Sequence, residues 1–115
     1  MARAVRPHGG RLHQGWQFRE VHQSGNSIHG SLMTLVSMPR PEDTGRVAYV
    51  ASRKVGPAVL RNRAKRLLRE SFRAISPEIR DRACWRIWIA RSACATAKLG
   101  AVSSEMAELL GKETS

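Results

Sequence analysis

The sequence has little of what several large classes of protein need. Its 115 residues include two cysteines, one tyrosine and two phenylalanines, and only nine of them are acidic. No apolar run is long enough to cross a bilayer, and the first ten residues lack the continuous apolar stretch of a secretory signal. The sequence therefore predicts one small cytoplasmic domain that has no membrane-spanning segment.

Other absences argue against chemistry performed by the protein itself. Cys84 and Cys94 flank an expected strand ten positions apart, too far for a disulfide unless the chain doubles back. They form no Cys-x-x-Cys pair, and all four histidines precede residue 30, so no zinc site is expected. No nucleophile stands with a base, and the carboxylates show no repeated ligand spacing. We expect no catalytic residue, no metal ligand and no cofactor bound by the protein alone.

Positive charge is abundant. Twenty lysines and arginines, most of them arginine, oppose nine acidic residues and give a formal net charge of +11. Such a field attracts a polyanion, and arginine grips phosphate with a planar fork that also stacks on bases. A nucleic acid is therefore the favoured partner. An anionic membrane surface is the weaker alternative, because the apolar face of the basic segment described below has no Trp or Tyr at its borders.

Apolar spacing predicts the order of the elements. Alternation along residues 85–91 predicts a strand with Trp85 and Trp88 on opposite faces, where packing is favoured over a contact with RNA. The whole order predicts an α+β domain with one sheet. The expected elements are a helix that ends at residues 24–27, strands at 31–38 and 46–51 paired as a hairpin, a helix at 57–74, the strand at 85–91, and a last helix capped by Ser103 or Ser104 that runs to Lys112.

The most informative segment is residues 53–73, which hold eight cations and one acid. A solvated helix face usually mixes signs, yet Arg61, Lys65 and Arg69 are like charges at i,i+4 spacing, which repel unless phosphates neutralise them. The pattern predicts one face for the core and one for a nucleic acid, with Arg61 and Phe72 at the border. On a helical wheel the first arc holds Leu60, Ala64, Leu67, Leu68, Ser71 and Ile75, and the opposite arc holds Asn62, Arg63, Lys65, Arg66, Arg69 and Arg73.

These residues also carry a family resemblance. The sequence resembles the signature of bacterial ribonuclease P proteins, with weaker agreement at Phe18-x-x-Val21, Arg46-Val47 and Ile87-x-Ile89-Ala90-Arg91. The resemblance implies an α-β-β-β-α-β-α domain at residues 12–112, with one mixed sheet and a basic crossover helix. The basic composition of residues 1–11 predicts a flexible N-terminus before it. The matching motifs are Ser52-Arg53-Lys54, Val55-Gly56-Pro57-Ala58-Val59 and Arg61-Asn62-Arg63-x-Lys65-Arg66-x-x-Arg69-Glu70-x-Phe72-Arg73.

The resemblance implies a subunit of an endoribonuclease that matures the 5′ end of tRNA. Its partners would be the catalytic RNA and precursor tRNA, with no obligate protein partner. Catalysis would lie in the RNA, and Mg²⁺ would act through the RNA. The implied contacts to the catalytic RNA are Arg61, Asn62, Arg63, Lys65, Arg66 and Arg69, and those that border the single-stranded 5′ leader of precursor tRNA are Phe18, Ser52, Arg53 and Lys54.

Two alternatives stay open at this point. A stand-alone basic RNA-binding module, of ribosomal or RNA-chaperone type, would carry the same helix without a catalytic partner. Phe18 fits a stacking platform for a leader base and a core aromatic about equally well. His22 stands where the family often has a second aromatic, so a leaner leader platform is expected.

Overall fold

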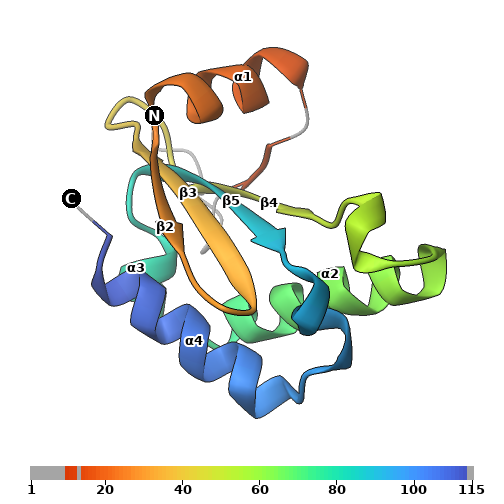
Figure 1. The fold of residues 1–115 in the computed structure, drawn as a ribbon. Coiled ribbons are helices and arrows are strands. Elements are labelled where there is room, and N and C mark those ends of the chain that lie inside the picture. The colour runs from red at the N-terminus through yellow and green to blue at the C-terminus, as the bar shows by residue number, and fades with distance from the viewer. Residues whose placement is uncertain (1–9, 13, 114–115) are drawn as a thin grey trace.

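The computed structural model describes residues 10–12 and 14–113. Over these residues the chain forms a mixed five-stranded sheet in the order β1-β4-β5-β3-β2, with α1 on one face and α2 and α4 on the other (Figure 1). This confirms the expected α+β class. In chain order the elements are β1 (Gly10–Arg11), α1 (Gly15–Ser24), β2 (Asn26–His29), β3 (Met33–Pro39), β4 (Arg46–Val50), the 3-10 helix η1 (Arg53–Val55), α2 (Ala58–Arg73), α3 (Pro77–Arg80), β5 (Cys84–Ala90), the 3-10 helix η2 (Ser92–Thr96) and α4 (Leu99–Gly111).

The N-terminal segment is only partly described. Residues 1–9 of the expected flexible stretch lie outside the described residues. Its last two residues, Gly10 and Arg11, pair in parallel with Arg46 and Val47 of β4 as the short strand β1.

The predicted hairpin of residues 31–38 with 46–51 is wrong. Strand β5 lies between β3 and β4, antiparallel to the first and parallel to the second. Six of the seven β5 residues are buried, so this strand needs a neighbour at each edge and a helix on each face. β3 instead forms its hairpin with β2, whose first residues the sequence analysis had assigned to the end of the first helix.

The alternation along β5 builds two separate cores. Trp85 and Ile87 pack with Val21 of α1, whereas Trp88 and Ala90 pack under α2 and α4. This confirms the prediction that the two tryptophans lie on opposite faces. Both are buried, at 2% and 0% exposure.

The connection from β4 to β5 is the crossover that the resemblance implied. β4 and β5 are parallel neighbours, so the chain between them must return over one face of the sheet to the end where β5 begins. It does so through η1, α2 and α3. Pro57 precedes the first residue of α2, and Pro77 follows its end by four residues. The bounds agree with the predicted 57–74 to within one residue at each end.

The start of the last helix is a second correction. α4 begins at Leu99 rather than at Ser103 or Ser104. One turn earlier than predicted, Val102 already packs into the core with 0% exposure. Ser103 does not cap the helix, because its hydroxyl donates to the hydroxyl of Ser71 in α2, at 3.0 Å. Apolar packing therefore extends this helix beyond the point that a capping residue marked.

Candidate nucleic-acid interface

Helix α2 has two chemically distinct sides. The predicted inner side is buried through Ala64, Leu67, Leu68 and Ser71. Phe72, expected at the border, is also buried and contacts the Trp88 ring at 6.0 Å between centroids. These contacts fix the rotation of α2 about its axis, and the opposite side is thereby turned away from the sheet.

The opposite side gathers five of the six residues that were assigned to a catalytic RNA. A shallow hollow on this side is lined by Val59, Asn62, Arg63, Lys65, Arg66 and Arg69, and we call these residues the outer face. The lining residues include no acid. Arg61, the sixth assigned residue, is half-buried and does not line the hollow. The outer face therefore presents four cations on one surface, the arrangement that phosphates neutralise.

Arg63 is held by the protein as well as exposed. Its Nε donates to the carbonyl oxygen of Ala95 in η2 at 2.7 Å. The bond fixes the plane of the guanidinium, so this side chain loses little freedom when it binds an anion. The fold itself therefore orients the Arg63 guanidinium within the outer face.

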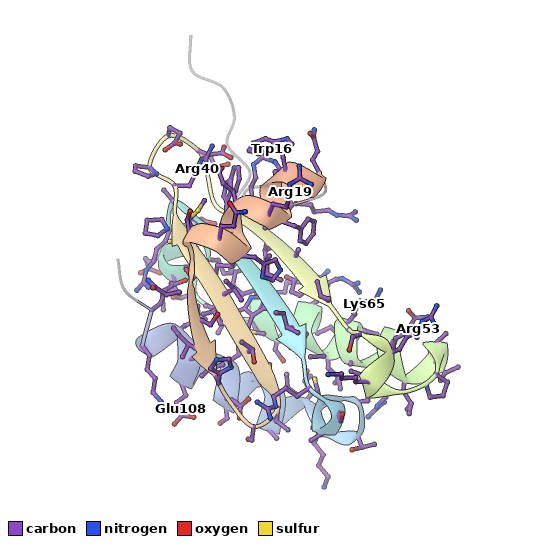
Figure 2. All side chains as sticks on the ribbon, turned by 45° about the horizontal axis from the view of Figure 1, so that its top comes forward. Trp16, Arg19, Arg40, Arg53, Lys65 and Glu108 are labelled. Atoms are coloured by element: carbon purple, nitrogen blue, oxygen red, sulfur yellow. The ribbon has the colours of Figure 1, made fainter. Side chains whose placement is uncertain are left out.

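Three of the residues assigned to a 5′ leader lie in and beside η1. Ser52 precedes η1 and accepts a hydrogen bond from the backbone N–H of Lys54 at 3.3 Å. The Lys54 carbonyl accepts one from the Ser92 hydroxyl at 3.2 Å, which ties η1 to η2. Ser52, Arg53 and Lys54 are exposed. Figure 2 places Arg53, like Lys65, at the end of the molecule where β4 leads into α2.

The fourth assigned leader residue, Phe18, sits on α1. It is half-buried and, like Val50 and Ile89, packs against the smaller core from its edge. Neither cavity described here contains both Phe18 and Ser52–Lys54. Phe18 and the Ser52–Lys54 segment are nonetheless connected through β4, because Val50, which packs against the same core as Phe18, lies two residues before Ser52.

A deeper cleft lies beside β4, and sequence reasoning did not find it. It has a volume of about 690 Å³ and opens at the edge of the sheet where β1 ends. We call it the edge cleft. It brings Phe18 together with the outer-face cations Lys65 and Arg69. Residues without an assigned role also line it, among them Arg11, Leu12, Tyr49 and Arg73.

Tyr49 is the chemically distinctive member of the edge cleft. Burial raises the pKa of its hydroxyl to about 12, although the charges of Arg69, Arg73 and Arg80 act to lower it. The hydroxyl therefore keeps its proton at neutral pH and adds no negative charge to the cleft. Arg69 lies over the ring at 5.8 Å and Phe72 meets it edge-on at 6.5 Å. Only the fact that Tyr49 is the single tyrosine could have drawn attention to it in the sequence.

The two cysteines are packed rather than reactive. Both are buried and unpaired, and burial raises the pKa of both thiols, that of Cys94 to about 11. Within residues 10–12 and 14–113 no group of three His, Cys, Asp or Glu side chains is arranged to hold a metal ion. Over the same residues no helix is long and apolar enough to span a membrane.

The chain is similar to known proteins over nearly its whole length. The family model described as "Ribonuclease P" matches residues 7–114. A "Ribonuclease P protein component" of Dehalococcoides mccartyi is 38% identical over 91% of this chain and 85% of its own. One of Caldanaerobacter subterraneus is 30% identical over 89% and 87%. The solved "RNase P protein from Thermotoga maritima" has the same fold, with a TM-score of 0.79 at 23% identity over 91% of this chain and 98% of that one.

Proposed function

The chain belongs to the family of ribonuclease P protein components, and we propose that its α2 outer face docks on the catalytic RNA of that enzyme. The family match favours this function over the stand-alone RNA-binding module that the charge alone would allow. The observation that carries the docking proposal is the outer face, where Arg63, Lys65, Arg66 and Arg69 line one hollow with no acid among its lining residues.

The division of labour is part of the proposal. We assign hydrolysis of the phosphodiester at the 5′ end of the tRNA to the RNA subunit. Magnesium ions held by that RNA would stabilise the attacking and leaving oxygens. The described residues of this chain offer no cluster suited to such an ion. The protein neutralises phosphate repulsion and positions the precursor tRNA on the catalytic RNA.

The substrate site is proposed at Phe18 of α1 and at Ser52, Arg53 and Lys54 in and beside η1. Phe18 offers a ring on which any base can stack, and the exposed cations Arg53 and Lys54 can neutralise the backbone beside it. Ser52 adds a hydroxyl that can bond to a phosphate or sugar oxygen. Stacking without base-edge recognition suits a leader whose sequence varies among precursors.

A charge-matched pair of double variants tests the docking. Arg66→Gln/Arg69→Gln removes two outer-face cations, and Lys98→Gln/Lys112→Gln removes two exposed cations from the ends of α4. Filter binding to the catalytic RNA is measured over a range of salt concentrations. We expect the first variant to flatten the plot of log affinity against log salt by roughly two units, because each phosphate contact contributes about one. We expect the second to behave nearly as the unchanged protein.

The result that would overturn the docking is equally direct. If the outer-face variant folds normally and keeps both affinity and salt slope, the outer face is only solvated charge.

A second measurement addresses the division of labour. Nuclease-free protein should not cleave precursor tRNA by itself, and cleavage should appear when the catalytic RNA and Mg²⁺ are added. Reproducible 5′ maturation without the RNA would refute that part of the proposal.

A further inference from the structure

The edge cleft exists because β4 is only partly covered at its outer edge. Among the described residues β1 pairs with Arg46 and Val47, and the backbone bond farthest along β4 at this edge runs from the Leu12 N–H to the Val47 carbonyl at 3.1 Å. Beyond that point Tyr49 borders the opening, and α2 passes alongside. The volume of about 690 Å³ falls within the range of small-molecule binding sites.

The lining combines cations with apolar and aromatic groups, and β1 adds the cation Arg11. Lys65, Arg69 and Arg73 come from α2, and among the described residues that line the cleft there is no Asp or Glu. The half-buried ring of Tyr49 supplies an aromatic surface, and Leu12, at 4% exposure, closes the base of the opening. A free inorganic anion would use the cations alone, and an apolar ligand would use the aromatic surface alone. A nucleotide uses both, because its base stacks on an aromatic surface while its phosphate pairs with cations.

The position of the cleft indicates which RNA supplies the nucleotide. Lys65 and Arg69 line both the outer face and the edge cleft. An RNA strand held on the outer face therefore passes the mouth of the cleft without a gap in its contacts. A base can enter only if it is unstacked from its own helix, so the occupant comes from a loop, a bulge or a joining strand.

We propose that one unpaired nucleotide of the catalytic RNA turns out of its stack into the edge cleft, with its base against Tyr49 and its phosphate among Lys65, Arg69 and Arg73. This proposal rests on the docking of α2 on that RNA. The protonated Tyr49 hydroxyl can donate a hydrogen bond to a base oxygen or nitrogen. The contact would fix the rotation of the RNA about α2, which phosphate contacts alone leave free to slide.

Three single variants separate this proposal from the docking on which it rests. Tyr49→Leu removes the ring but keeps an apolar side chain. Arg73→Gln removes a cation that lines only the edge cleft, and Arg66→Gln is its matched control, an exposed arginine of the same helix that lines only the outer face. Phe18 is left unchanged because it also borders the proposed leader path. Thermal unfolding midpoints establish that each variant is folded before binding is measured.

The expected results are a loss of affinity and a defined cross-link. Tyr49→Leu should weaken binding of the catalytic RNA by about 5- to 140-fold, the effect of losing one stacked base. Arg73→Gln should lower the salt slope by about 0.7 unit, as for one contact to a single strand. Catalytic RNA that carries 4-thiouridine or 6-thioguanosine should cross-link on irradiation to the tryptic peptide of residues 47–53, whose single aromatic residue is Tyr49.

Any other result refutes the cleft proposal, the docking of α2, or the assignment of the nucleotide to the catalytic RNA. If Arg66→Gln weakens RNA binding while Tyr49→Leu and Arg73→Gln do not, and peptide 47–53 carries no cross-link, the cleft proposal is wrong and the docking stands. If all three variants bind as the unchanged protein does, the docking itself fails and the cleft proposal with it. If Tyr49→Leu reduces only the affinity of the assembled holoenzyme for precursor tRNA, the occupant belongs to the substrate and the assignment to the catalytic RNA is refuted.

Discussion

The replacement Glu113→Gln should be among the most damaging single changes near the C-terminus. The side chains of Glu113 and Arg86 are each 1% exposed. The carboxylate accepts hydrogen bonds from Arg86 Nε at 2.7 Å and Nη2 at 2.8 Å, from Arg82 Nη1 at 3.1 Å and from the Ser37 hydroxyl at 2.5 Å. It thereby joins the end of α4 to β3 and β5.

The magnitude follows from what Gln leaves behind. Arg86 would stay buried with its charge unbalanced, and the amide NH₂ of the new side chain would face guanidinium donors. The carbonyl oxygen of the new Gln and the backbone carbonyl oxygens of Ile79 and Arg80, at 2.9 and 3.3 Å, could still accept from Arg86, but none of them balances its charge. Breaking one side of a buried pair costs about 3–5 kcal/mol, a large part of the roughly 5–15 kcal/mol that stabilises a small domain.

Urea unfolding with matched controls measures the effect. Glu108→Gln removes the same charge from an exposed position of α4 and should change the free energy of unfolding by less than about 0.5 kcal/mol. Replacing both partners, as in Arg86→Met/Glu113→Leu, should restore much of the loss, because no buried charge is left alone. This reasoning is refuted if the free energy of unfolding of Glu113→Gln lies within about 1 kcal/mol of that of the unchanged protein, or if the double variant is no more stable than Glu113→Gln.

The same pair predicts a dependence on pH. Burial alone would raise the pKa of the Glu113 carboxyl, but the hydrogen bonds and charge of Arg86, with Ser37 and Arg82, bring it below its usual value of 4.5. The stability from this group is therefore complete above pH 4.5 and is lost as the pH falls through the lower folded pKa. The free-energy gap between the unchanged protein and Glu113→Gln should shrink over that acid range. A gap that stays constant from neutral pH into the acid range would contradict it.

Three further replacements test other parts of the molecule. Phe18→Ala should weaken the affinity of the holoenzyme for precursor tRNA by about 1–3 kcal/mol and leave its affinity for mature tRNA nearly unchanged. Equal losses of affinity for both tRNAs would indicate that Phe18 only packs in the core. Leu68→Ala, at a position with 0% exposure, should lower the free energy of unfolding by about 2–5 kcal/mol, while the folded fraction keeps its affinity for the catalytic RNA. Glu105→Gln should lower the free energy of unfolding by about 1–3 kcal/mol. The Glu105 carboxylate accepts hydrogen bonds from the backbone N–H groups of Ser31, Leu32 and Met33 at 3.0, 2.7 and 3.0 Å, between β2 and β3. An unchanged free energy in urea unfolding would show that these bonds do not stabilise the β2–β3 connection.

Helix α2 could be predicted from the sequence because everything that defines it is local. Its apolar residues recur at helical spacing, Pro57 marks its start and Pro77 follows its end. The same periodicity assigned the outer face, and five of the six positions do line one hollow. Arg61 is the exception: it is half-buried and does not line the hollow.

The edge cleft could not be predicted, because its walls meet only in the folded chain. Tyr49 alternates with its neighbours in β4 and has the pattern of an ordinary core residue. Leu12 is placed by its backbone bond to Val47, a contact between residues 35 positions apart. Arg73 belonged to the predicted polar arc, but nothing in a helical wheel separates a cation that faces solvent from one that faces the edge of a sheet.

The strand order that sequence reasoning missed is also what opens the edge cleft. A β3–β4 hairpin with β5 as the parallel partner of β4 would place a full strand on each side of β4 and close both of its edges. With β5 between β3 and β4, the outer edge of β4 is paired, within residues 10–12 and 14–113, with the two residues of β1. The crossover that leaves β4 must return to β5, so α2 lies alongside that edge and brings Lys65, Arg69 and Arg73 to it. The burial of β5 thus decides the topology, and the topology in turn places three cations of α2 beside an aromatic wall.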